Sequence, residues 1–122
     1  MTEIERRTVG IVDDDQAVRD SLRFLLEVVG HSAETFASAV EFLNADLSNL
    51  RCLILDHHMP GITGLELAER LRTDGVGIPI LLVTGSPSPA IVARAAELGV
   101  DRVLEKPLTK EELLDFINAT SC

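Results

Sequence analysis

The sequence predicts an α/β domain built around a parallel β-sheet, and two observations lead to this prediction. Apolar runs of strand length recur along the 122 residues, and segments with helical patterns lie between them. Three of the runs are almost continuously apolar, which is typical of strands that helices cover on both faces. Five such strand and helix pairs predict a doubly wound sheet in one domain that spans residues 1–122.

The expected strands are the apolar runs themselves, and the second of them is the weakest. They cover Thr8–Val12, Ser32–Phe36, Cys52–Leu55, Ile78–Val83 and Arg102–Leu104.

The expected helices are indicated by periodicity or by residues that favour helix ends. In the first helix, an apolar stripe at i, i+4, i+7, i+8 and i+11 comprises Val18, Leu22, Leu25, Leu26 and Val29. Gly30 ends this helix. Capping boxes mark the second, third and fifth helices at Ser38/Glu41, Thr63/Glu66 and Thr109/Glu112. The fourth helix begins at Ser88-Pro89 and ends at Gly99.

Composition excludes several classes of protein. The 20 acidic and 11 basic residues give a net charge of −9, and the basic residues are scattered, so direct binding of nucleic acid is not expected. No stretch approaches the roughly 20 apolar residues of a membrane span, and the N-terminal residues lack the apolar core of a signal peptide. Cys52 and Cys122 form no disulfide framework in this interpretation. We therefore expect a cytoplasmic protein.

Polar residues follow four of the five expected strands. They are Asp13-Asp14-Asp15, Asp56, Thr84-Gly85-Ser86 and Lys106-Pro107. In a doubly wound sheet, ligands bind at the carboxyl ends of the strands, where these residues meet.

Carboxylates gathered at one point favour a hard divalent cation, and Mg²⁺ is the expected ion. A nearby lysine and hydroxyl suit a small dianion, so attack of a carboxylate on a phosphoryl donor is the expected chemistry. Two other interpretations apply to parts of the cluster. Asp15 is expected to cap the first helix, whereas Asp13 and Asp14 are expected to bind metal. A transition-metal site at His57-His58 is disfavoured because no third ligand has suitable spacing.

Four segments together resemble the receiver domains of two-component response regulators, and within that family the FixJ-like branch. They are GIVDDDQAVRDSL, CLILDHHMPGITGLEL, PILLVTGS and VLEKP, and the resemblance extends from Val9 to Ile117. It implies a flavodoxin-like (βα)5 fold with strand order 2-1-3-4-5.

The resemblance also implies roles for individual residues. Asp56 matches the phosphoacceptor, Thr84 the switch hydroxyl and Lys106 the phosphoryl-contacting lysine. Asp13, Asp14, Asp56 and the backbone carbonyl of His58 match the ligands of Mg²⁺. The Lys106-Pro107 bond matches a peptide that the family usually holds in cis.

Partners and regulation follow from the same resemblance. The phosphoryl donor would be a sensor histidine kinase or a histidine phosphotransfer protein, and the output would be a linked domain or a separate downstream protein. His58 and Ser86 are expected to tune the lifetime of the phosphoryl group. Such a domain assists its own phosphorylation and dephosphorylation but is not classed as an enzyme.

One position departs from the family pattern. Val103 stands three residues before Lys106, where a typical receiver has Phe or Tyr. A β-branched valine has one dominant side-chain rotamer and cannot swing as a ring does. Pro87 and Pro89 also restrict the loop after Thr84.

Two other functions remain as alternatives. Asp13-Asp14-Asp15 also fits the Asp-x-Asp start of a haloacid-dehalogenase-like phosphohydrolase, which would leave Asp56 without a role. A receiver-fold binding module that is never phosphorylated is the second alternative. The intact set of Asp56, its acidic pair and Lys106 disfavours it.

Overall fold

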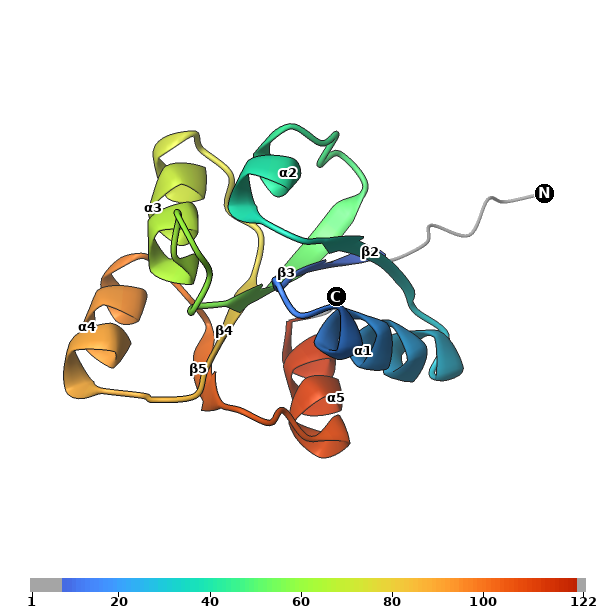
Figure 1. The fold of residues 1–122 in the computed structure, drawn as a ribbon. Coiled ribbons are helices and arrows are strands. Elements are labelled where there is room, and N and C mark those ends of the chain that lie inside the picture. The colour runs from blue at the N-terminus through green and yellow to red at the C-terminus, as the bar shows by residue number, and fades with distance from the viewer. Residues whose placement is uncertain (1–7, 121–122) are drawn as a thin grey trace.

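The computed structural model describes residues 8–120 of the chain, in which five parallel strands form one sheet in the order β2-β1-β3-β4-β5 (Figure 1). The strands are β1 (Thr8–Val12), β2 (Ser32–Phe36), β3 (Leu50–Asp56), β4 (Ile80–Thr84) and β5 (Arg102–Glu105). The helices are α1 (Gln16–Val28), α2 (Ala39–Leu43), α3 (Gly64–Thr73), α4 (Pro89–Glu97) and α5 (Lys110–Ala119). The predicted fold class and strand order are therefore confirmed.

Three strands differ in length from the prediction, and one of them is β5, which ends at Glu105, one residue later than expected. β3 begins two residues earlier because Leu50 pairs with Thr8 before the register shifts between Thr8 and Val9. β4 begins at Ile80, later than expected, since Pro79 has no amide proton and Arg72 takes the carbonyl of Ile78.

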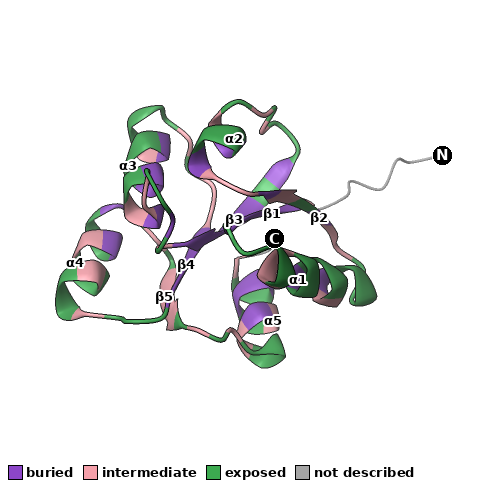
Figure 2. Ribbon diagram, viewed as in Figure 1, coloured by how far each residue is buried: buried purple, intermediate pink, exposed green. Residues whose placement is uncertain are grey.

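Helices cover both faces of the sheet. Figure 1 shows α1 and α5 on one face, and α2, α3 and α4 on the other. Along β4, Leu81 and Val83 face the α1/α5 layer while Ile80 and Leu82 face the opposite layer, so the strand is buried on both sides. Figure 2 shows the buried strands between the two layers of helices. The outward sides of these helices are mainly exposed.

The predicted helix starts are largely confirmed. Asp15 caps α1, and its carboxylate accepts hydrogen bonds from the amides of Ala17 and Val18. Complete capping boxes begin α3 and α5. The box predicted at Ser38 is half formed. Its hydroxyl accepts from the amide of Glu41, but the Glu41 carboxylate accepts from the amide of Ala37 instead of Ser38.

Cys52 corrects one expectation. It is fully buried in β3 and is disulfide-bonded, so a count of cysteines did not predict its state. Spacing along the chain does not show which residues meet in space. Cys122 and the N-terminal residues 1–7 lie outside the described residues. Within residues 8–120, no helix has both the length and the apolar character that crossing a membrane requires.

Candidate functional site

The acidic residues of the predicted site meet where the strand order reverses. Asp13 follows β1 and Asp56 ends β3. These two strands are neighbours in the sheet, and the chain adds β2 on one side of them and β4 and β5 on the other. Both side chains are buried, while Asp14 is exposed. Carboxylate oxygens of Asp13, Asp14 and Asp56 lie within 4.8 Å of one another. The structure thus brings the three predicted acidic residues together.

Lys106 reaches this cluster from the end of β5. Its Nζ lies 2.8 Å from Oδ1 of Asp56 and 3.6 Å from Oδ2 of Asp13. Partial burial would lower the pKa of Lys106, but the Asp56 and Asp13 carboxylates outweigh it and raise the pKa. The Lys106–Pro107 peptide is cis, as the resemblance implied. Lys106 is therefore a fixed positive charge beside Asp56.

Backbone amides hold two of the carboxylates in place. The amide of Asp15 donates to Oδ1 of Asp13 at 2.9 Å, and the amide of His58 donates to Oδ1 of Asp56 at 3.2 Å. Arg19, which sequence reasoning missed, donates to the carbonyl of Asp13 at 2.7 Å. The position of Arg19 in the first turn of α1, directly after the three aspartates, could have predicted this contact. The acidic side chains are consequently oriented by their own loops.

The surroundings of Asp13 disfavour its ionised form. Burial raises the pKa of Asp13, and the charges of Asp56 and Asp14 raise it further. The amide of Asp15 and the ammonium of Lys106 act in the opposite direction without cancelling the rise. A divalent cation would relieve the same repulsion, which is consistent with a metal-binding role.

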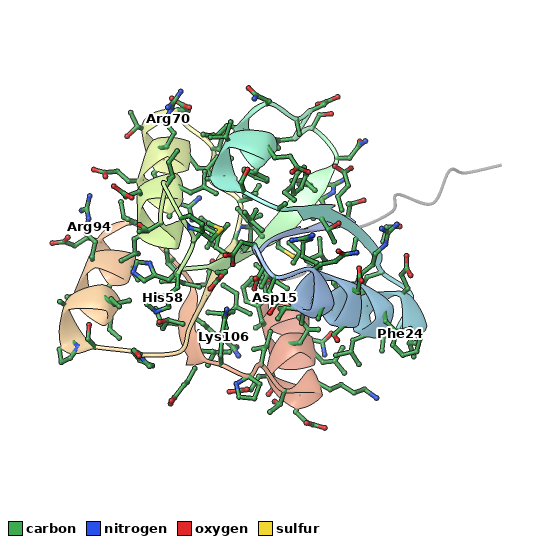
Figure 3. The ribbon with its side chains drawn as sticks, in the orientation of Figure 1. Asp15, Phe24, His58, Arg70, Arg94 and Lys106 are labelled. Carbon is green, nitrogen blue, oxygen red and sulfur yellow. The ribbon has the colours of Figure 1, made fainter. Side chains whose placement is uncertain are left out.

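Thr84 ends β4 and is fully buried. Its Oγ1 accepts a hydrogen bond from the amide of Ser86 at 3.1 Å and lies 2.7 Å from Nε2 of His58. Figure 3 shows His58 on the loop that follows β3, at the same edge of the sheet as Lys106. Sequence reasoning placed His58 and Ser86 near the site but missed the contact between the imidazole and Thr84.

Gly64 allows α3 to begin directly behind Asp56. A Cβ atom at this position would lie 2.6 Å from the Asp56 carbonyl oxygen and 2.9 Å from Cα of His57. Both are backbone atoms that cannot move aside, and the amide of Gly64 donates to the carbonyl of His57 at 3.1 Å. The glycine is therefore required by close approach of two backbone segments.

A cavity of about 330 Å³ adjoins the acidic cluster. Asp13, Asp56 and Lys106 lie along its polar part. Side chains of β1, β3, β4 and α1 and of the segment after β5 form the remainder, which is mainly apolar. The Asp56 carboxylate is thus buried within the fold but borders a space large enough for a phosphoryl group.

The donor atoms suit a hard cation. Three carboxylates converge, and within residues 8–120 the groups that could hold a metal include no histidine or cysteine. The disfavoured transition-metal site at His57-His58 therefore finds no support in the described residues. The contribution of the His58 carbonyl as a ligand stays a prediction.

Fold and site together define a signalling domain of the receiver type, and comparison with known proteins identifies the family. The sequence model of the response regulator receiver domain matches residues 9–118. The chain belongs to this family, which serves two-component signalling.

Individual relatives support the assignment. The chain is 38% identical over 113 residues to the transcriptional regulatory protein TdiR of Thauera aromatica, covering 92% of this chain and 50% of TdiR. It is 37% identical over 117 residues to FixJ of Azorhizobium caulinodans, covering 95% of this chain and 56% of FixJ. The chain thus spans about half the length of these relatives.

Solved structures show the same fold. The FixJ-N crystal structure superposes with a TM-score of 0.84 at 32% identity, covering 97% of this chain and 95% of the other. The chemotaxis protein CheY4 of Vibrio cholerae gives a TM-score of 0.86 at 28% identity, with coverage of 94% and 98%. The FixJ-like resemblance noted in the sequence agrees with these comparisons.

Proposed function

We propose that Asp56 accepts a phosphoryl group from a phosphohistidine and that the resulting acyl phosphate is later hydrolysed. The observation that carries the proposal is the buried Asp56 carboxylate, with Oδ1 2.8 Å from Nζ of Lys106 and beside two further carboxylates. An Asp56 oxygen attacks phosphorus, the P–N bond breaks, and the donor imidazole leaves with the bonding electron pair. In hydrolysis, water attacks phosphorus and the bond to Asp56 breaks, which releases inorganic phosphate.

Asp13, Asp14, Asp56 and the His58 carbonyl are the residues that would hold Mg²⁺. When bound, this ion neutralises negative charge on the phosphoryl oxygens and on the acceptor carboxylate. Lys106 would supply a second positive charge, and the hydroxyl of Thr84, a buried residue, would donate a hydrogen bond to a phosphoryl oxygen. Asp13 and Asp14 act as ligands in this scheme and exchange no proton.

The donor proposed here is a sensor histidine kinase or a histidine phosphotransfer protein. The cavity beside Asp56 supports its approach from the side of α1 and the segment after β5. TdiR and FixJ are named transcriptional regulatory proteins and are about twice the matched length, so we propose an output region that regulates transcription. A separate downstream protein is the other possible output. A cytoplasmic location and the absence of enzyme status both stay predictions, and the disulfide at Cys52 gives the former no support.

Intact-mass spectrometry with a small acyl-phosphate donor tests the assignment. In the presence of Mg²⁺, the wild-type protein should gain one phosphoryl group, and chelation of the metal should prevent the gain. Asp56→Asn should abolish it, whereas Asp20→Asn, at an exposed position of α1, should not. Equal labelling of wild type and Asp56→Asn would overturn the proposal. Rapid turnover of a generic phosphate ester would instead favour a phosphohydrolase.

A further inference from the structure

The imidazole of His58 contacts the buried hydroxyl of Thr84 across the site. Nε2 of His58 lies 2.7 Å from Oγ1 of Thr84, and the two residues come from the loop after β3 and the end of β4. His58 is otherwise exposed, whereas Thr84 is completely inaccessible. The amide of His58 also donates to Asp56. One residue therefore touches both the acceptor carboxylate and the switch hydroxyl.

Hydrogen-bond satisfaction gives the direction of this contact. A hydroxyl has one proton and two lone pairs, and the Ser86 amide already donates to one lone pair of Thr84. A buried hydroxyl proton rarely lacks an acceptor, and the acceptor that the described contacts provide is Nε2 of His58. Thr84 consequently donates to His58, which carries its own proton on Nδ1, where the exposed side chain can meet water.

We propose that His58 is a positioning residue that competes with the phosphoryl group for the Thr84 hydroxyl proton. The inference rests on the proposed phosphorylation of Asp56. In the unphosphorylated protein, the imidazole holds the hydroxyl proton. To donate to a phosphoryl oxygen, Thr84 must first release His58. The phosphorylated state therefore carries the cost of one broken hydrogen bond, and His58 is freed when that state forms.

Binding of beryllofluoride with Mg²⁺ measures this competition in the unphosphorylated protein. His58→Leu removes the acceptor and keeps the backbone amide, so its affinity for beryllofluoride should rise about fivefold, the ratio that the net free energy of one neutral hydrogen bond represents. His58→Gln retains an acceptor oxygen and should stay near the wild-type value. All variants are compared at the same pH and the same Mg²⁺ concentration.

A double-mutant cycle separates competition from a merely structural effect. In a Thr84→Val background there is no hydroxyl proton to hold, so His58→Leu should change the affinity no further. Thermal melts confirm that each variant is folded. Lower affinity in His58→Leu, unchanged affinity, or an equal gain in the Thr84→Val background would each overturn the proposal.

Nitrogen NMR of the His58 ring provides an independent measurement. The free protein should show a proton on Nδ1 and an accepting Nε2, and binding of beryllofluoride should remove the hydrogen bond at Nε2. A proton on Nε2 in the free protein would contradict the inference. Failure of phosphorylation itself looks different, because the wild type would then bind no beryllofluoride or Asp56→Asn would bind it equally well.

Discussion

His57, the residue that follows Asp56, has a buried ring nitrogen without a partner. Within the described residues, Nδ1 of His57 is the buried side-chain atom that finds no hydrogen bond. Burial lowers the pKa of His57, and the neighbouring His58 adds to this effect. A depressed folded-state pKa contributes stability above the unfolded value of 6.5. That contribution is lost as the pH falls through the folded value.

His57→Leu should remove both the unpaired ring nitrogen and the group whose pKa is lowered. We expect the free energy of unfolding to rise by about 1 kcal/mol at neutral pH, because a buried unpaired nitrogen is replaced by apolar atoms. The loss of stability between about pH 7 and pH 5 should also shrink. Urea unfolding across that range measures both quantities. His31→Leu is the control and should retain the acid-side loss, whereas an unchanged pH profile in His57→Leu would contradict the argument.

Asp13 is a second residue whose surroundings disfavour its ionised form. Its raised pKa means that its contribution to stability is present below the unfolded value of 3.8 and is lost as the pH rises through the folded value. Once ionised, the carboxylate therefore destabilises the metal-free fold.

Asp13→Asn tests this cost directly. The amide oxygen can still accept from Asp15, so the variant should be about 1 kcal/mol more stable than wild type in chelator at neutral pH. It should also gain less stability from added Mg²⁺. Urea unfolding with and without Mg²⁺ gives both values, and Asp20→Asn serves as an exposed control. A less stable Asp13→Asn in chelator would favour a purely structural role for Asp13.

At the scale of elements, Arg72 joins the end of α3 to the end of α4. Its guanidinium donates to the carbonyls of Leu98 at 2.8 Å, Val76 at 2.8 Å, Ile78 at 2.9 Å and Gly99 at 3.1 Å. The helix α4 thus ends on a positive group that satisfies carbonyls without helical partners. Arg72 thus fixes the C-terminal end of α4, whereas the N-terminal end of α4 follows the loop after Thr84.

Arg72→Lys should therefore be costly although it keeps the charge. A single ammonium cannot reproduce the planar donor set, and we expect a loss of about 2 kcal/mol of unfolding free energy. Amide exchange at Gly99 and Val100 should become faster. Arg70→Lys is the matched control, since Arg70 pairs with Asp74 on an exposed surface where such a pair contributes less than about 1 kcal/mol. Equal stability of the two variants would refute this role for Arg72.

At the scale of the whole molecule, Thr84 at the site is connected to β5 through the pairing of β4 with β5, and β5 in turn contacts α4. Thr84 pairs with Glu105, and Leu82 pairs with Val103, which packs against the core formed with α2, α3 and α4. Val103 replaces the aromatic ring that a typical receiver carries. A signal from Thr84 should therefore pass through the loop before α4 instead of through a moving ring.

Amide exchange with and without beryllofluoride tests this route. Residues 85–98 should change their exchange rates on binding, whereas the core of α1 should not. Val103→Tyr should accept a phosphoryl group at Asp56 about as well as wild type but should bind the partner of the phosphorylated state with altered affinity, because a tyrosine adds a large amphipathic contact. Unchanged exchange over residues 85–98 in the wild type would exclude the loop route.

Several features were determined by the sequence alone. Apolar runs predicted the strands because burial on both faces requires continuous apolar residues, and the caps at Asp15, Thr63 and Thr109 predicted helix starts because their hydrogen bonds are local. Asp13, Asp56 and Lys106 could be placed together because parallel strands present their carboxyl ends at one edge of the sheet. The order of the strands came from resemblance to a known family.

Other features were decided by the tertiary structure. The contact of the His58 imidazole with Thr84 joins residues that are distant in the chain, and so do the hydrogen bonds from Arg72 to the carbonyls of Leu98 and Gly99. The exact start of β4 depends on the fold of the α3–β4 connection, in which Arg72 takes the carbonyl of Ile78. Local patterns predict local hydrogen bonds and burial, but contacts between separate loops arise only when packing brings those loops together.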